Sequence, residues 1–316
     1  MVRFYTTADE AMDLYAEHLQ KEYPTHLTPF HQRRTQDREA ALAEAMVFWM
    51  LKDMGLRPKM NEVVGTGGAD FICSQNFGPI FARREPTPES MFIVEATSLD
   101  PDAVSRNTSI PNEVPEDITG GAFRLLTRSV FAKAKDKATQ LAGYDMPRVL
   151  AIASSHEGIG AVFNSGAAVN ILISDYHWRQ EIGSNKFDPN RYVDLANSVF
   201  MKPGKDGTIE AARKSISAIL LIAVHGDQSV VHGILHPEPA KPLPIEFLPK
   251  VPFLRIAKWP ILDGRIFTEW VIADPDGLTI HHPITCPKRE RRQRSNPCIQ
   301  KMAIGRMSTW FPAFSC

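Results

Sequence analysis

The chain has 316 residues, of which 43% are hydrophobic and 23% are charged, and its 36 basic side chains balance its 36 acidic ones. This composition excludes a fibrous or wholly disordered chain, and the length allows one large domain or two modest ones. The longest apolar stretch, residues 216–224, is far shorter than the roughly 20 residues that cross a bilayer. Because no apolar leader precedes the first polar residues, we expect a cytoplasmic protein that does not span a membrane.

The charge is unevenly distributed along the chain. Residues 286–316 contain seven basic residues and one acidic residue, so this tail carries +6 and the rest of the chain −6. A net acidic body does not favour nonspecific phosphate binding, so a contact with nucleic acid would need a local basic patch. The tail has no hydrophobic periodicity, and we expect it to be basic and disordered.

The amino-terminal part of the chain predicts two helices. The first covers residues 8–23 and ends before Pro24. The second covers residues 36–54, with Thr35 as its amino-terminal cap and Gly55 just past its end.

Short apolar runs separated by turn residues then predict neighbouring strands of one sheet. They lie at residues 62–64, 70–73, 79–82 and 91–97, and a glycine-rich turn at 65–68 separates the first two.

The next segments alternate between helix and strand patterns. Residues 100–120 lack periodicity and predict a long loop, residues 122–142 predict a helix, and residues 148–153 predict a buried strand. This succession favours an α/β layer fold. The Pro-rich segment 237–260 predicts an extended path across the surface. Three more apolar runs could be strands of the sheet or helices against it, at residues 169–173, 216–224 and 230–235.

Three acidic residues stand where a charge is unusual. Glu95 interrupts an apolar strand, Asp70 opens another strand after the glycine turn, and Glu44 lies in the second helix. If they converge, each close pair repels by about 4 kcal/mol at 4 Å and an effective dielectric near 20. A divalent cation would relieve this repulsion, and oxygen ligands suit Mg²⁺, with Mn²⁺ as a substitute.

The predicted helix 122–142 supplies the opposite charge. Lys133, Lys137 and Gln140 share one helix face, which can meet the carboxylates. Each candidate also has a plain structural explanation, because exposed helix glutamates, turn aspartates and solvated lysine stripes are common.

These residues resemble the PD-(D/E)XK nuclease superfamily over about residues 36–154. Glu44 matches the helix glutamate of that family, Ala69 and Asp70 stand where Pro-Asp is usual, and Glu95 opens the segment that takes the place of Glu-x-Lys. The resemblance implies a restriction-endonuclease-like core with a central mixed sheet flanked by helices. It also implies Mg²⁺ held by Asp70, Glu95 and Glu44, and hydrolysis of nucleic acid, with DNA as the expected substrate.

One departure from the family pattern concerns charge. Thr97 stands where the motif lysine is expected, and a hydroxyl cannot supply a positive charge. In some branches of the family the lysine moves to the following helix, so Lys137, Lys133 and Gln140 are the candidates for its role. A catalytically inactive module that keeps this fold and binds nucleic acid or a protein partner is the alternative.

The sequence therefore predicts three parts: an amino-terminal helical segment (1–34), a nuclease-like α/β domain (35–262) and a Pro-rich, basic carboxy-terminal extension (263–316). A protein partner docked on the Pro-rich segment, or a homodimer, stays open as a further interaction.

Overall fold

A nine-stranded mixed sheet runs through the part of the chain that the computed structural model describes. That part comprises residues 7–65, 67–75, 90–108, 112, 120–156, 158, 163, 165–180, 187–225, 228–261, 266–273 and 279–283, all within the unit Met1–Ile284. The strand order is β1-β2-β3-β4-β9-β10-β11-β12-β13. Strands β3, β4 and β9 run parallel, as do β10 and β11, whereas the other neighbours are antiparallel. In sheet order the strands are β1 (Leu56–Met60), β2 (Phe71–Gln75), β3 (Met91–Ser98), β4 (Arg148–Ser154), β9 (Ala218–His225), β10 (Gln228–Leu235), β11 (Phe253–Ile256), β12 (Thr268–Ala273) and β13 (Thr279–Pro283).

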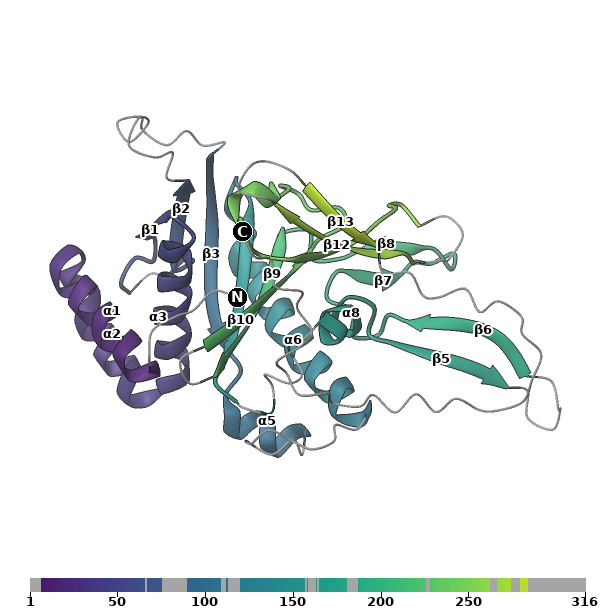
Figure 1. Ribbon diagram of the computed structural model, residues 1–316, viewed down its shortest axis with the longest axis horizontal. Coiled ribbons are helices and arrows are strands. Elements are labelled where there is room, and N and C mark those ends of the chain that lie inside the picture. The colour runs from purple at the N-terminus through teal and green to yellow at the C-terminus, as the bar shows by residue number, and fades with distance from the viewer. Residues whose placement is uncertain are drawn as a thin grey trace, which may run out of the picture. The chain divides into compact units, whose positions relative to one another are not determined.

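Helices cover both faces of this sheet, as Figure 1 shows. One face carries α1 (Ala8–Glu22), α2 (Pro24–Gln36) and α3 (Arg38–Asp53), and the other carries α6 (Gly120–Leu141) and α8 (Ser165–Ile173). Strand β3 explains the division, because Phe92 and Val94 pack into the core with α3, whereas Ile93 packs into the core with α6. Alternate side chains of a strand point to opposite faces, so the central strands must be apolar on both.

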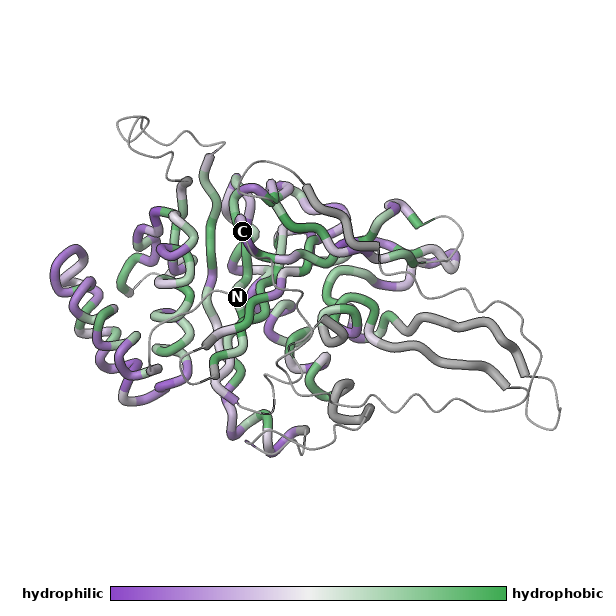
Figure 2. Tube along the Cα trace, in the orientation of Figure 1, coloured by the Kyte–Doolittle hydropathy of each residue, from purple (hydrophilic) through white to green (hydrophobic). Residues whose placement is uncertain are grey.

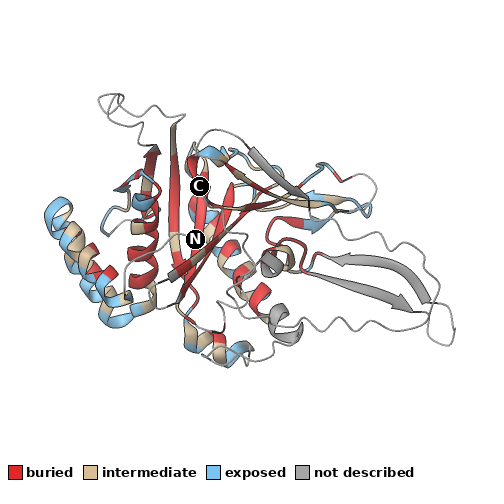
Figure 3. Ribbon diagram, in the orientation of Figure 1, coloured by how far each residue is buried: buried red, intermediate tan, exposed pale blue. Residues whose placement is uncertain are grey.

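Hydropathy and burial follow the same division. Figure 2 shows hydrophobic residues along the central strands and α3, and Figure 3 shows these elements buried while the outer faces of α1 and α2 are exposed. The remaining elements are a helix, α5 (Pro101–Thr108), a 3-10 turn, η2 (Ile245–Phe247), and two hairpins, β5 (Asp175–Gln180) with β6 (Phe187–Asp194) and β7 (Met201–Pro203) with β8 (Ile209–Ala211). The predicted α/β class with a large mixed sheet between helices is thereby confirmed.

The amino-terminal helices differ from the prediction in one respect. The chain does not leave helical structure after Pro24; instead this proline opens α2, where its missing N–H costs nothing. The cap of α3 is Asp37, whose Oδ1 accepts from the backbone N–H of Ala40 (3.0 Å), whereas the Thr35 hydroxyl donates to the His31 carbonyl oxygen within α2. Thr35 was therefore the wrong cap, because a helix continues through it.

The predicted strand at residues 62–64 and the predicted loop at residues 100–120 also need correction. Residues 62–64 do not form a strand, and in the described part of this segment Val63 and Gly67 form an isolated bridge. The strand lies earlier, as β1, where Pro58 is tolerated at the sheet edge. The predicted loop 100–120 begins instead with α5, because the Asp100 carboxylate accepts from the backbone N–H groups of residues 102 and 103.

The Pro-rich segment is more buried than predicted. Leu243, Leu248 and Val251 pack into the core with α3, and the segment then enters the sheet as β11 beside β10. The apolar runs left open resolve as helix α8 for residues 169–173 and as strands β9 and β10 for the other two. The predicted strand 79–82 and the basic tail lie outside the described residues. Within the described residues, no helix is both long and apolar enough for a membrane crossing.

Candidate active site

Asp70 and Glu95 lie side by side on neighbouring chain segments. Strands β2 and β3 pair antiparallel with Phe71 opposite Val94, so the next pair in this register is Asp70 with Glu95. The backbone N–H of Ala96 donates to Asp70 Oδ2 (2.6 Å), which fixes the aspartate against β3. Both carboxylates are buried, Asp70 with 9% and Glu95 with 3% of its surface exposed. The antiparallel register is thus what brings the two predicted acids together.

Helix α6 contributes the polar groups that face Glu95. Lys137 Nζ donates to Glu95 Oε1 (2.5 Å) and to Gln140 Oε1 (3.0 Å), while Gln140 Nε2 donates to Glu95 Oε2 (3.2 Å). Residues three apart on a helix share a face, so one turn of α6 engages both carboxylate oxygens. Lys133 lies one turn earlier, and among the described residues it pairs with neither acid. Of the two lysines that the sequence left open, Lys137 is the one at the site.

Two further residues hold the turn that precedes Asp70. The Tyr144 hydroxyl accepts from the backbone N–H of Ala69 (2.8 Å) and from Asn61 Nδ2 (3.0 Å), and Gln140 Nε2 donates to the Gly68 carbonyl oxygen (2.8 Å). Gly68 has φ +135, and a Cβ atom there would lie 3.2 Å from the tyrosine hydroxyl oxygen. The turn is therefore fixed by Gln140, which the sequence singled out, and by Tyr144 and Asn61, which it did not.

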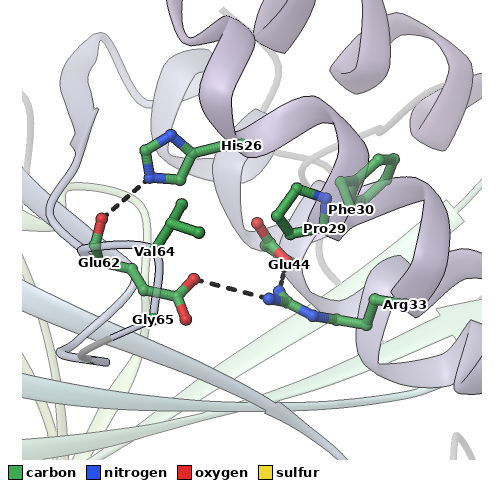
Figure 4. Close-up of a pocket in the computed structure, with 8 residues that line it drawn as sticks. All are labelled: His26, Pro29, Phe30, Arg33, Glu44, Glu62, Val64 and Gly65. Carbon is green, nitrogen blue, oxygen red and sulfur yellow. Dashed lines mark hydrogen bonds and ion pairs between the residues drawn. The ribbon is translucent and has the colours of Figure 1, made fainter.

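Glu44 reaches the cluster from the other face of the sheet. It is 4% exposed, and both of its carboxylate oxygens have partners: the Tyr15 hydroxyl donates to Oε1 (2.9 Å), and Arg33 Nη1 donates to Oε2. Arg33 also pairs through Nη2 with Glu62 Oε2 (3.5 Å). Figure 4 shows this guanidinium between the two glutamates.

The sequence reasoning missed Tyr15, Arg33 and Glu62. The first two lie on α1 and α2, which precede the motif segment, and nothing in their local sequence pattern relates them to a glutamate on α3. Glu62 lies three residues before the glycine-rich turn, in the segment predicted as a strand, and nothing in its local pattern marked it as a site residue. Only the packing of α1 and α2 on α3 places Tyr15 and Arg33 at the site.

A small pocket of about 80 Å³ lies beside these residues, between α2, α3 and the turn before Asp70. Figure 4 shows the eight lining residues, with Arg33 and Glu62 in the pocket wall and His26 Nε2–H donating to the Glu62 carbonyl oxygen (2.9 Å). The lining consists of His26, Pro29, Phe30, Arg33, Glu44, Glu62, Val64 and Gly65.

The electrostatics of the site are dominated by an excess of buried negative charge. Burial raises the pKa of Asp70 well above its usual value, and Glu95 and Glu44 raise it further, although the Ala96 hydrogen bond opposes this. Burial likewise raises the pKa of Glu95, against the opposing effect of Lys137.

The glutamate on α3 behaves in the same way. Burial raises the pKa of Glu44, while Arg33 and the Tyr15 hydroxyl oppose the rise. Glu62 raises the pKa of all three buried acids. Four carboxylates thus face two cations, Arg33 and Lys137, which leaves an excess of two negative charges when all are ionised.

The donor set of this site fits a hard divalent cation in part. Mg²⁺ commonly binds one or two carboxylates together with water, and the adjacent Asp70 and Glu95 side chains supply two. Glu44 is not grouped with these two acids, because it pairs with Tyr15 and Arg33 on the α3 side of the sheet, whereas Glu95 pairs with Lys137 on the α6 side. Among the described residues, no three His, Cys, Asp or Glu side chains form a group that could hold a metal ion.

Comparison with known proteins gives no match. No protein-family model matches the chain, and no curated protein and no solved structure is significantly similar to it. The chemistry of the site therefore has to be inferred from its own residues.

Proposed function

We propose that the protein is a Mg²⁺-dependent nuclease that hydrolyses phosphodiester bonds of nucleic acid, with DNA as the expected substrate. The observation that supports this is the pairing of Asp70 with Glu95 on adjacent segments, with Lys137 and Gln140 reaching Glu95 from the next helix. In this arrangement two carboxylates that can hold a metal and one ammonium group share a small region, which suits metal-assisted phosphate hydrolysis.

The protein groups have separate tasks in the proposed reaction. Asp70 and Glu95 would hold Mg²⁺, which polarises the phosphate and lowers the pKa of a bound water. Lys137 and Gln140 orient the Glu95 carboxylate, and the ammonium group stabilises negative charge that develops on the phosphate. The water oxygen forms a bond to phosphorus, the P–O ester bond breaks, and the leaving oxygen takes up a proton.

The alternative is a module with this site that binds nucleic acid or a protein without turnover. The observation that favours it is the lysine position: Thr97 is uncharged, and the ammonium group of Lys137 is already paired with Glu95. A paired ammonium can fix a carboxylate without taking part in hydrolysis.

A nicking assay on supercoiled plasmid separates these functions. Cleavage is expected with Mg²⁺ or Mn²⁺ and not with EDTA, and Asp70→Asn or Glu95→Gln should remove it. Lys137→Ala should lower the rate by about 10²-fold, the usual effect of removing one preorganised electrostatic group. Lys133→Ala is the matched control, because it removes the same charge one turn away on the same helix. Turnover that survives in Asp70→Asn would exclude the proposed mechanism, and a wild type that binds DNA but never nicks it would favour the module.

A further inference from the structure

Arg33 has hydrogen-bonding capacity beyond its two glutamate partners. A guanidinium carries five N–H donors, and here Nη1 serves Glu44 and Nη2 faces Glu62. Among the described residues it has no other hydrogen-bond or ion-pair partner, and its side chain is 29% exposed in the wall of the pocket in Figure 4. The remaining donors are therefore available to a group that enters the pocket.

Glu44 acts as the anchor of this arginine. It is buried, it is held by Tyr15 on its other oxygen, and it lies on the long helix α3. A guanidinium fixed by a buried carboxylate loses little side-chain freedom when it binds an anion. This arrangement assigns Glu44 a positioning role in place of the predicted role as metal ligand.

The pocket has the size and the place for a phosphate group. Its volume of about 80 Å³ is well below the roughly 150 Å³ of a cavity that encloses a benzene ring, so it is too small to enclose a nucleobase. Gly65 and Val64 in its wall belong to the connection that leads to Asp70, and the Asp70 charge acts on Arg33. Arg33 therefore lies within electrostatic range of Asp70.

We propose that Arg33 binds a phosphate oxygen of the nucleic acid strand in this pocket, with Glu44 as its positioning residue. The inference rests on the proposed function, because it takes nucleic acid as the ligand. The local excess of two negative charges does not oppose it once a divalent cation has joined Asp70 and Glu95. Arginine is suited to this contact, since its planar fork matches phosphate oxygens.

Nucleic acid affinity measured without turnover tests this proposal. Fluorescence anisotropy of labelled DNA and RNA oligonucleotides of one sequence would be recorded with Ca²⁺ in place of Mg²⁺, over a range of salt concentrations. Arg33→Ala should weaken binding by about 10-fold, the equivalent of one charge-assisted hydrogen bond, and lower the salt slope by about 1. Arg33→Lys keeps the charge but loses the fork, so it should fall between the wild type and the alanine variant.

Arg34 provides the matched control. It is the next residue, it has the same exposed fraction of 29%, and it pairs with Asp13 (2.5 Å) on α1 and not with the glutamates of the pocket. Arg34→Ala should leave affinity and salt slope unchanged, and thermal denaturation identifies any variant that fails to fold. If Arg33→Ala does not fold, Arg33→Lys with an unchanged affinity and salt slope would overturn the proposal.

The outcomes separate this proposal from the nuclease activity. If the protein nicks plasmid, and Arg33→Ala weakens nucleic acid binding no more than Arg34→Ala does, the arginine contact alone is overturned. If binding depends on Arg33 but the protein never nicks plasmid, the arginine contact is supported and the proposed nuclease activity is overturned. A wild type that binds neither DNA nor RNA overturns both.

Discussion

Asp70 is buried and is repelled by three other acids, Glu95, Glu44 and Glu62, which has a cost in the protein without metal. Its neighbours cannot neutralise it, because Lys137 pairs with Glu95 and Arg33 pairs with Glu44. Its contact with the Ala96 N–H offsets part of the cost of burial. Such a site gains most from a bound cation, since the same charges that repel each other attract the ion.

The pKa of Asp70 predicts how stability depends on pH. Burial and the neighbouring acids raise this pKa, so the folded protein holds the proton more tightly than the unfolded chain. The resulting stabilisation is present below the unfolded pKa of about 3.9 and is lost as the pH rises through the folded pKa. Without metal at neutral pH, Asp70→Asn should therefore increase the free energy of unfolding, by about 1 kcal/mol as is usual for single sites.

Urea denaturation in EDTA at several pH values measures this gain, which should shrink toward pH 4 or below. Asp53→Asn, at an exposed aspartate, is the control and should change little. Mg²⁺ at about 100 times its Kd should stabilise the wild type by about 2.7 kcal/mol and the Asp70→Asn variant by much less. A variant less stable than the wild type at neutral pH in EDTA would contradict this account of the charge.

Helix α3 shows how one element serves both the core and the site. Its apolar side chains are buried on the sheet and under α1, while Glu44 projects among the polar groups of Tyr15 and Arg33. The position of this glutamate therefore depends on where the helix begins, and the beginning is set by the Asp37 cap.

The identity of this cap gives an element-scale prediction. Asp37→Ala removes the acceptor for the Ala40 N–H and should lower the free energy of unfolding by about 1 kcal/mol. Thr35→Ala, two residues earlier on α2, should cost clearly less, because its hydroxyl donates to a carbonyl within a helix and caps nothing. Chemical denaturation of both variants measures these losses. A larger loss of stability in Thr35→Ala than in Asp37→Ala would show that Thr35 is the cap.

At the scale of the whole molecule, the sheet is continuous from the candidate site to its last strand. Strands β11, β12 and β13 join it through the parallel pairing of β10 with β11, where Gly233 lies opposite Phe253. A Cβ atom on Gly233 would lie 2.1 Å from the buried Phe253 ring. This glycine allows the Pro-rich segment to return into the core.

Gly233→Ala should therefore destabilise the protein by about 1–3 kcal/mol, the range for overpacked cores. Gly143→Ala is the matched control, since a Cβ atom there meets nothing within 4 Å. Thermal and urea denaturation of the two variants measure the difference. Equal stability of the two would show that the β10 and β11 contact can relax at little cost.

The sequence by itself determined the elements whose patterns are local: α1, α3, α6, the central strands, and the acids Asp70, just before β2, and Glu95, in β3. It could not determine α2, β1 or the burial of the Pro-rich segment, because each depends on partners distant in the chain. It left open which of Lys137 and Lys133 serves the site, and only the contact of α6 with β3 brings Lys137 to Glu95.

The pairing of Glu44 with Tyr15 and Arg33 was likewise decided by tertiary structure alone. Hydrophobic periodicity reports which face of an element is buried, whereas the partner of a buried charge is fixed by how elements far apart in the chain pack together.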